Sequence, residues 1–437
     1  MINIVDGIPG LGKTQFAIQM INNHILEFWG DFESSDAFSM NFLYVTPYID
    51  EVKRIHDSID AEIIDPNTED GKTKSKHLSE LINKGKSVVM THSLFLKISD
   101  TLFSILEKNE YTLILDEVID PLEPINITKS DINILKNSNS IEIDSTGKVF
   151  WKNEEYEEEF KKTNRFNDIK IACERERLYS NEKQSIFVEM ISPKLFKSFE
   201  NIYVLTYLFE GQILKYYFDY FNMKYQLYSV KKESNQYKLI PLNRKNEDRA
   251  SIKENLEIYE DKPPKRGPSP SLNFPRDPSN GKNYLSSGWL KTASEDDLKK
   301  LKNNIRNYFN NAIGCKTTEL FWTTLKEKAS DLKSDKNTYH KDSNKDNFLF
   351  LNIKATNEYR ERKAAAYIYS RYMIPDIKLF FNSWRPKNNP VDEDIFALSE
   401  LIQFIFRGRI REGKKLYCYI PSHRMRALLY KWLDHEL

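Results

Sequence analysis

The chain has 437 residues, enough for two or three domains with sizeable cores. Its 65 Lys and Arg residues nearly balance 64 Asp and Glu residues, so only a local basic patch could attract nucleic acid. The three cysteines, Cys173, Cys315 and Cys418, lie far apart in the sequence, which argues against a disulfide framework and against a zinc site. No stretch approaches the ~18 apolar residues of a membrane span, so we expect a cytoplasmic protein without a membrane partner.

A phosphate-binding loop is predicted at the start of the chain, between an apolar run at 2–6 and an amphipathic helical pattern at 14–21. Backbone N–H groups of such a loop, together with the positive end of the helix dipole, bind phosphate oxygens. Lys13 would contact the β- and γ-phosphates, and the Thr14 hydroxyl would ligate Mg²⁺. The pattern indicates a triphosphatase that uses ATP and Mg²⁺, and the alternative is a plain glycine turn. The residues that fit G-x-x-x-x-G-K-[ST] are Gly7, Ile8, Pro9, Gly10, Leu11, Gly12, Lys13 and Thr14.

The first 210 residues alternate short apolar runs with helical patterns such as 50–59 and 77–84. Near-continuous apolar runs are typical of a parallel sheet that is covered on both faces, which predicts a doubly wound α/β domain over 1–235. An insertion at about 121–200 interrupts the pattern with a β-hairpin at 141–151 and an acidic, solvated run at 154–159. The predicted strands of this domain are 42–46, 61–64, 87–91, 112–116 and 202–206.

A second α/β domain is predicted over 236–437. Residues 263–278 hold six of the 17 prolines, so we expect an extended loop at about 261–283, and the polar stretch 333–346 is similar. The predicted strands are 322–324, 348–352 and 416–420, and the predicted helices are 362–372 and 399–411.

Two adjacent acids end the predicted strand at 112–116. Asp116 and Glu117 would lie beside the phosphate loop, because the carboxyl ends of parallel strands meet at one edge of the sheet. Asp116 would hold the magnesium ion and Glu117 would act as the general base on the attacking water. A polar turn is the alternative interpretation.

A third set of candidate residues lies in the predicted helix at 399–411. Gln403, Arg407 and Arg411 recur at i, i+4 and i+8, so in a helix they would share one face. That face could present arginine fingers to a γ-phosphate bound by the other domain. The alternative is a solvated basic face.

Together, the phosphate loop, the Asp116–Glu117 pair and the late Gln–Arg–Arg pattern resemble superfamily-2 helicases, and more narrowly the DEAD/DEAH-like helicases of tailed bacteriophages. The resemblance implies two tandem RecA-like parallel-sheet domains, ATP in the cleft between them, and nucleic acid, DNA rather than RNA, across their tops. It also implies replication or recombination partner proteins, and the host cytoplasm if a phage encodes the chain. The stretches that fit the narrower resemblance are 205–211, 322–324, 354–359 and 420–426.

Several strand-end residues match the nucleic-acid loops of such helicases, namely Thr46 with Pro47, Thr91 and Thr356. Thr206 matches the loop that couples hydrolysis to domain movement. The sequence also departs from the family pattern. The upstream glutamine motif that reads adenine is absent, and the arginines are four residues apart, so Arg409 competes with Arg407 as the finger.

The end of the chain offers a local basic patch. Residues 398–431 carry eight Lys or Arg against Glu400 and Glu412, and Arg424 and Arg426 are candidate nucleic-acid contacts, with a solvated surface as the alternative. Two other functions stay open. A terminase-like packaging motor normally adds a nuclease with clustered carboxylates, which this basic end lacks. A non-translocating, ATP-switched binding protein is the other.

Overall fold

A computed structural model describes most of the chain. The acidic run 154–159, Thr356 and nearly all of the proline-rich stretch lie outside the described residues. The described residues are 1–30, 41–68, 71–153, 165–261, 272–273, 283–333, 339, 341–342, 345–350 and 358–437.

The N-terminal part is built on a seven-stranded sheet of order β12-β11-β1-β10-β4-β2-β3. All neighbours are parallel except β12, which runs antiparallel to β11. The expected boundary after residue 235 falls between β11 and β12, inside this sheet. The strands are β1 (Ile2–Asp6), β2 (Phe42–Thr46), β3 (Val88–Thr91), β4 (Thr112–Asp116), β10 (Asn201–Thr206), β11 (Tyr225–Glu233) and β12 (Gln236–Pro241).

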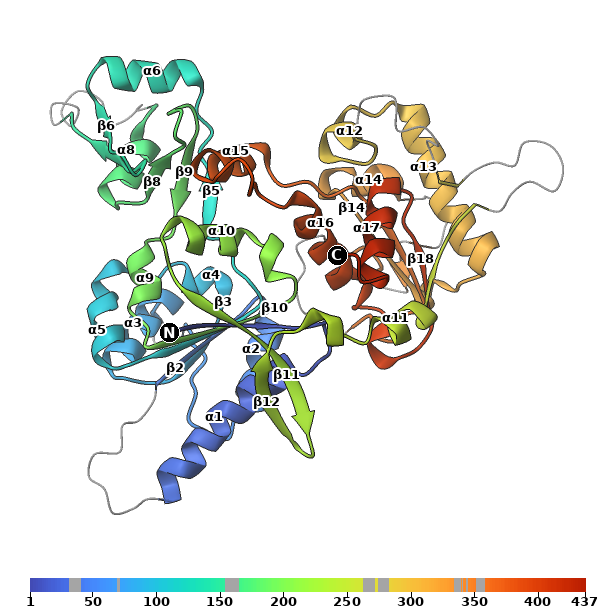
Figure 1. Ribbon diagram of the computed structural model, residues 1–437, viewed down its shortest axis with the longest axis horizontal. Coiled ribbons are helices and arrows are strands. Elements are labelled where there is room, and N and C mark those ends of the chain that lie inside the picture. The colour runs from blue at the N-terminus through green and yellow to red at the C-terminus, as the bar shows by residue number, and fades with distance from the viewer. Residues whose placement is uncertain are drawn as a thin grey trace.

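Helices cover both faces of this sheet (Figure 1). Successive residues of one strand enter different cores, since Ile4 packs with one cluster and Val5 with the other. The expected strand at 61–64 is reduced to a single bridge between Ile64 and Val88, so that prediction was wrong. The helices are α1 (Lys13–Gly30), α2 (Ile49–His56), α3 (Lys74–Asn83), α4 (His92–Phe95), α5 (Phe103–Lys108), α9 (Pro193–Lys197) and α10 (Ile213–Tyr220).

A small middle unit is inserted between β4 and β10 and lies above the sheet in Figure 1. It has its own apolar core, which includes Ile132, Val149 and Phe187. The predicted hairpin insertion is therefore present. Its elements are β5 (Leu122–Pro124), α6 (Lys129–Asn137), β6 (Ile141–Ile143), β7 (Val149–Trp151), α8 (Asn167–Glu174), β8 (Leu178–Ser180) and β9 (Phe187–Met190).

The C-terminal part has a second parallel sheet, of order β13-β18-β17-β14. The α/β class with two parallel sheets is thus confirmed. A two-stranded ladder of β15 (Lys341–Asp342) and β16 (Lys345–Asp346) lies apart from it. The other elements are α11 (Arg249–Asn255), β13 (Leu256–Ile258), α12 (Ser287–Thr292), α13 (Glu295–Asn307), β14 (Leu320–Thr324), α14 (Ala329–Leu332), β17 (Ala364–Ile368), α15 (Pro375–Trp384), α16 (Glu393–Ile405), β18 (Leu416–Tyr419) and α17 (His423–Leu433).

Two predictions for this part were wrong. Where a helix was expected at 362–372, the structure has the strand β17. Its five residues are buried and pair with strands on both sides, and there tertiary packing outweighs the helix propensity of alanine. The strand expected at 348–352 is reduced, within the described residues, to a bridge between Phe348 and Trp322.

Helix α15 connects three parts of the molecule. Trp384 Nε1 donates to the carbonyl of Ser180 in the middle unit, with an N···O distance of 3.3 Å. Just beyond the helix, Arg385 pairs at 2.7 Å with Asp219 of α10. A C-terminal helix is thus tied to both the middle unit and the first domain.

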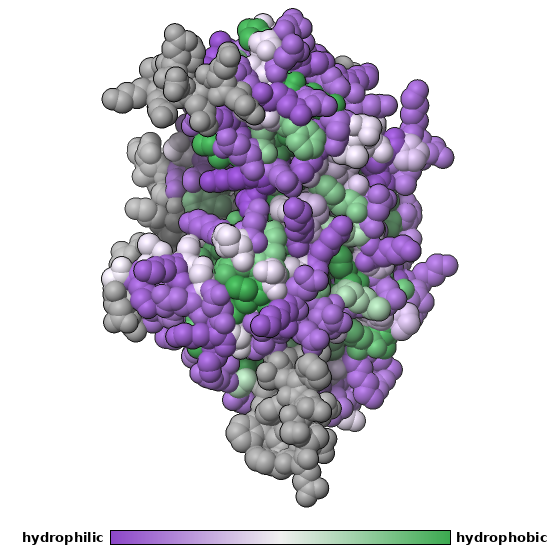
Figure 2. All heavy atoms as spheres, turned by 90° about the vertical axis from the view of Figure 1, so that its left-hand side faces the viewer, coloured by the Kyte–Doolittle hydropathy of each residue, from purple (hydrophilic) through white to green (hydrophobic). Residues whose placement is uncertain are grey.

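The face on the left of Figure 1 is mostly hydrophilic, with small apolar areas between charged side chains (Figure 2). Of the helices that the structure describes, none combines the length and apolar content needed to span a bilayer.

Candidate active site

The phosphate loop joins β1 to α1 at the carboxyl end of β1, next to the central strand β10. Gly10 and Gly12 have positive φ angles of 96° and 99°, which side-chain-bearing residues rarely adopt. Both glycines are also closely covered. A Cβ at Gly10 would lie 3.2 Å from Cγ of Arg411, and a Cβ at Gly12 would lie 2.2 Å from Cε1 of Tyr237. The sequence therefore needs glycine at both positions.

The ammonium of Lys13 points back into the loop. It donates to the carbonyls of Gly7 and, at 3.3 Å, of Ile8. Burial lowers the pKa of Lys13, while the neighbouring carboxylates, Glu117 first among them, act in the opposite direction. The loop thus places one cation and several N–H groups where phosphate oxygens would bind.

Thr14 and Asp116 come together as a pair of oxygen ligands. Thr14 Oγ1 donates to Asp116 Oδ2 at 3.1 Å, and the hydroxyl of Tyr44 donates to the same oxygen at 3.0 Å. Burial raises the pKa of Asp116, and these two hydrogen bonds act against that shift.

No group of three His, Cys, Asp or Glu side chains in the described residues is arranged to hold a metal. One carboxylate and one hydroxyl nevertheless fit Mg²⁺, which commonly binds one or two protein oxygens together with substrate phosphates. Tyr44 orients the carboxylate and is a residue that the sequence patterns did not indicate.

Glu117 follows β4 in an unusual conformation, with a φ angle of 78°. Its N–H donates to the Leu205 carbonyl of β10 at 2.9 Å, and its Oε2 accepts from Gln403 Nε2 at 3.3 Å. Non-glycine residues with positive φ are uncommon and occur often at functional sites. The carboxylate therefore meets a side chain of α16, from the C-terminal part, across the cavity.

The expected continuous helix at 399–411 is wrong. Helix α16 ends at Ile405, a turn follows at Phe406–Gly408, and a short 3₁₀ segment spans Arg409–Glu412. Gly408 fits this turn, since a Cβ there would lie 2.9 Å from Leu416. Gln403, Arg407 and Arg411 therefore do not share one helix face.

The turn nevertheless brings all three predicted residues to one cavity of about 240 Å³ beside the phosphate loop. The first domain contributes the loop, the acidic pair and Glu51, Arg54 and Tyr237, and the C-terminal part contributes one more apolar side chain, Phe406. Glu51 and Arg54, which form an ion pair, are further residues that no sequence pattern indicated. The lining residues are Pro9, Gly10, Gly12, Lys13, Thr14, Gln15, Glu51, Arg54, Asp116, Glu117, Tyr237, Gln403, Phe406, Arg407 and Arg411.

The three arginines of this turn differ in their surroundings. Arg407 is 9% exposed, and among the described residues one nitrogen of its guanidinium is buried without a hydrogen-bond partner. Burial lowers the pKa of Arg407 to about 10. Arg411 is exposed and covers Gly10, whereas Arg409 donates to the Lys415 carbonyl and does not line the cavity. Arg407 is thus a buried cation suited to an anionic ligand.

A larger adjoining cavity of about 740 Å³ shares Gln403 and Arg407 with the first. Pro47 and Ser93, which follow β2 and β3, line it, while Thr46 is fully buried and Thr91 is half-buried at the strand ends. The segments after both strands therefore reach this cavity, but of the predicted residues that the structure describes only Pro47 lines it, and Thr46 and Thr91 do not.

Arg424 and Arg426 line neither cavity and are engaged within the protein. Arg424 pairs with Asp394 at 2.6 Å. Arg426 is 8% exposed, pairs with Glu260 at 3.1 Å, and donates to the Ile420 carbonyl at 2.7 Å. A nucleic-acid role for these two arginines stays a prediction.

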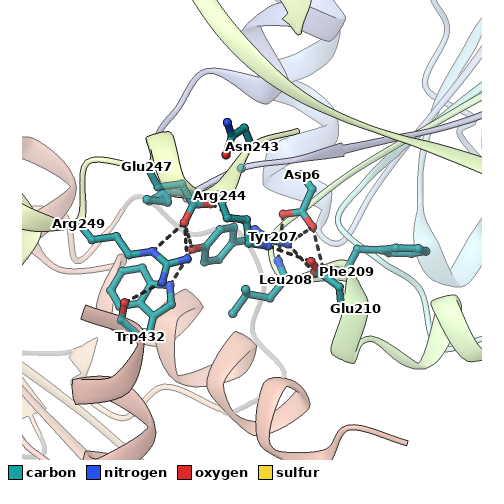
Figure 3. A network of polar contacts seen from close by, with 12 residues as sticks. Asp6, Tyr207, Leu208, Phe209, Glu210, Asn243, Arg244, Glu247, Arg249 and Trp432 are labelled. Carbon is teal, nitrogen blue, oxygen red and sulfur yellow. Dashed lines mark hydrogen bonds and ion pairs between the residues drawn. The ribbon is translucent and has the colours of Figure 1, made fainter. Parts of the chain in front are cut away.

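A buried network connects the phosphate-loop strand to the end of the chain (Figure 3). Asp6, which immediately precedes the loop, is fully buried and accepts from Leu208 N at 3.0 Å and from Arg244 Nη2 at 2.7 Å. Arg244 also pairs with Glu210 and Glu247. Burial raises the pKa of Asp6, and the Arg244 guanidinium opposes that shift.

The network continues into the C-terminal part. Glu247 accepts from Tyr207 Oη at 2.9 Å and from Arg249 Nε at 2.8 Å. Trp432 Nε1 of α17 donates to Tyr207 at 2.8 Å. Thr206, which was predicted to couple the domains, is the last residue of β10. The segment that follows it contacts both halves of the chain, through Leu208 and Tyr207. In the sequence, the role of Asp6 is indicated only by its position as an acid at the end of an apolar run.

Two family models match the chain. Residues 250–433 match the model described as the YonV C-terminal Rossmann-like domain, and residues 122–188 match the YonV middle domain. Over 447 residues the chain is 33% identical to the SPbeta prophage-derived uncharacterized protein YonV of Bacillus subtilis (strain 168), covering 100% of this chain and 99% of that relative. The chain belongs to the YonV family. The middle unit seen here corresponds to the YonV middle domain.

Two solved structures are also similar to this YonV-family chain. S. tokodaii Xpd4 matches with a TM-score of 0.43 and 12% identity, and an XPD helicase with a TM-score of 0.40 and 11% identity. Each match covers 100% of this chain and 94% of the other. The Bacillus subtilis relative is prophage-derived, in line with the bacteriophage part of the resemblance noted from the sequence.

Proposed function

We propose that this YonV-family protein hydrolyses ATP between two RecA-like domains and uses the reaction to move along nucleic acid or to separate its strands. The observation that carries the proposal is the cavity of about 240 Å³ in which the phosphate loop and Glu117 face Gln403, Arg407 and Arg411. Residues from both sheets meet there, as a site that couples hydrolysis to domain movement requires.

The residues have separate roles in the proposed reaction. Loop N–H groups bind the phosphates, and Lys13 exchanges its contacts with the Gly7 and Ile8 carbonyls for phosphate oxygens. Glu117 accepts a proton from water, whose oxygen bonds to the γ-phosphorus as the bond to the bridging oxygen breaks, giving ADP and phosphate. Arg407 and Arg411 stabilise the charge of the transition state. Magnesium bound at Thr14 and Asp116 would neutralise phosphate charge.

Nucleic acid is proposed to cross the larger cavity, which is lined by Pro47 after β2 and by Ser93 in α4 after β3. DNA is the expected polymer, with replication or recombination proteins as partners. A terminase-like motor and a non-translocating switch remain the alternatives, and a strand-displacement assay separates the switch from a helicase.

The test is the ATPase rate of Lys13→Ala and Glu117→Gln, with and without single-stranded DNA, duplex DNA and RNA. Lys13→Ala should abolish hydrolysis and weaken ATP binding. Glu117→Gln should bind ATP normally and hydrolyse it slowly, because only the proton acceptor is lost. The exposed α5 variants Lys108→Ala and Glu107→Gln are matched controls that should behave as wild type. Wild-type hydrolysis by Glu117→Gln would contradict the assignment of the base.

A further inference from the structure

Tyr237 lines the cavity beside the phosphate loop. It lies in β12, the strand that follows β11, the last parallel strand of the first sheet. The β11–β12 hairpin extends from the edge of the sheet alongside α1 (Figure 1). Tyr237 donates its backbone N–H at 2.9 Å to Oε1 of Gln19 on α1. Its ring also packs against the core that contains Phe16. The position of the ring is therefore fixed by the same helix whose N-terminus follows the phosphate loop.

The ring lies directly over the last glycine of the loop. An added Cβ at Gly12 would lie 2.2 Å from Cε1 and 3.0 Å from Cζ of Tyr237. The same ring lines the cavity, as does Gln15 in the first turn of α1. The ring is half-buried, and the ammonium of Lys232 lies over one of its faces, 5.7 Å from the ring centre.

Polar and charged groups from the C-terminal part also line the cavity. Arg411 covers Gly10 and Gln403 contacts Glu117, whereas Tyr237 covers Gly12. A nucleotide with its phosphates in the loop would then direct its base toward Tyr237. Aromatic side chains stack on every nucleobase, since each base has a π-face.

We infer that Tyr237 forms the base-stacking wall of the nucleotide site. This inference rests on the proposed function, because it assumes phosphates in the loop.

The experiment compares the binding of ATP, GTP and inorganic tripolyphosphate by calorimetry, each with Mg²⁺. Tyr237→Ala should weaken ATP and GTP binding by about tenfold, the loss of one stacking contact, and leave tripolyphosphate binding unchanged. Tyr237→Leu, which keeps apolar bulk over Gly12, should lose the same affinity, and Tyr237→Phe should bind as wild type. Tyr228→Ala changes a half-buried tyrosine of the same hairpin that does not line the cavity and should leave all affinities unchanged.

Two results would overturn the inference: unchanged ATP affinity in Tyr237→Ala and Tyr237→Leu, or an equal loss for ATP and tripolyphosphate, which would mean that the ring only supports the loop. The proposed function fails separately, if the wild-type protein binds neither ATP nor tripolyphosphate, or if Lys13→Ala binds both as the wild type does.

Discussion

The two parallel sheets differ in the segments that come after their strands. In the first sheet, β1 leads through the phosphate loop into α1, and β4 ends at Asp116. In the C-terminal part, Gly408 and Gly413-Lys414 repeat the glycine spacing of that loop. Two features differ: Lys415 stands where the loop has Ser or Thr, and the strand β18 follows in place of a helix. Lys414 and Lys415 are paired with Glu361 and Glu257. The strand before and the helix after a glycine loop therefore decide whether it can bind phosphate.

The second sheet contributes to the cavity in a different way. Its residues come from the end of α16 and the turn beyond it, not from a loop that binds phosphate through N–H groups. If this division is correct, the first sheet binds the nucleotide and the second contributes mainly to turnover. Variants in each half can test that division.

The largest effect is expected for the arginines of the turn. Arg407→Ala and Arg411→Ala should each lower kcat by on the order of 10³ with little change in ATP affinity, because arginine fingers act on the transition state. Arg409→Ala should have a mild effect, since Arg409 contacts the Lys415 carbonyl outside the cavity. Steady-state ATPase and separate nucleotide binding measure both quantities. An inactive Arg409→Ala beside an active Arg407→Ala would reverse the assignment.

A smaller effect is expected where the halves are joined. Arg244→Ala leaves Asp6 buried without its ion-pair partner and should lower the free energy of unfolding by about 3 kcal/mol. Adding Asp6→Asn should cost less than the sum of the two single changes, because both remove the same pair. Urea denaturation measures these values, and Lys245→Ala, at an exposed neighbouring residue, is the control. Strict additivity would mean that the pair contributes no coupling energy.

The smallest effect concerns the basic end of the chain. Arg426→Ala removes an ion pair with Glu260 and donors to two carbonyls and should lower the free energy of unfolding by about 2 kcal/mol. Lys431→Ala, on the exposed side of the same helix, should change it little. Thermal melting tests both variants. An Arg426→Ala protein of wild-type stability with weakened, salt-dependent DNA binding would instead favour the nucleic-acid role.

Local patterns predicted the first domain well, because β1, β2, β3 and β4 are apolar runs with little competing helical pattern. They failed at β17, whose Ala364–Ala366 run favours a helix until the sheet buries it. They also failed after Ile405, where the apolar Phe406 extended the helical pattern past the end of α16.

Within the site, the phosphate loop and the acidic pair could be predicted because motif and strand end coincide in the sequence. Tyr237 and Arg244 could not, because each contacts residues more than 200 positions away in the chain, and no local spacing encodes such a contact. Gln403 and Arg407 were found through an incorrect helix, since the turn happens to keep both beside Glu117.

The contacts of α15 have a mechanical consequence. Among the contacts that join the two halves of the chain are the buried network from Asp6 to Trp432 and the contacts of Trp384 and Arg385 with Ser180 and Asp219. These attachments lie on different elements, so a pivot about the buried network would load the contacts of α15. Such a pivot would require either that the middle unit moves with α15 or that those contacts break.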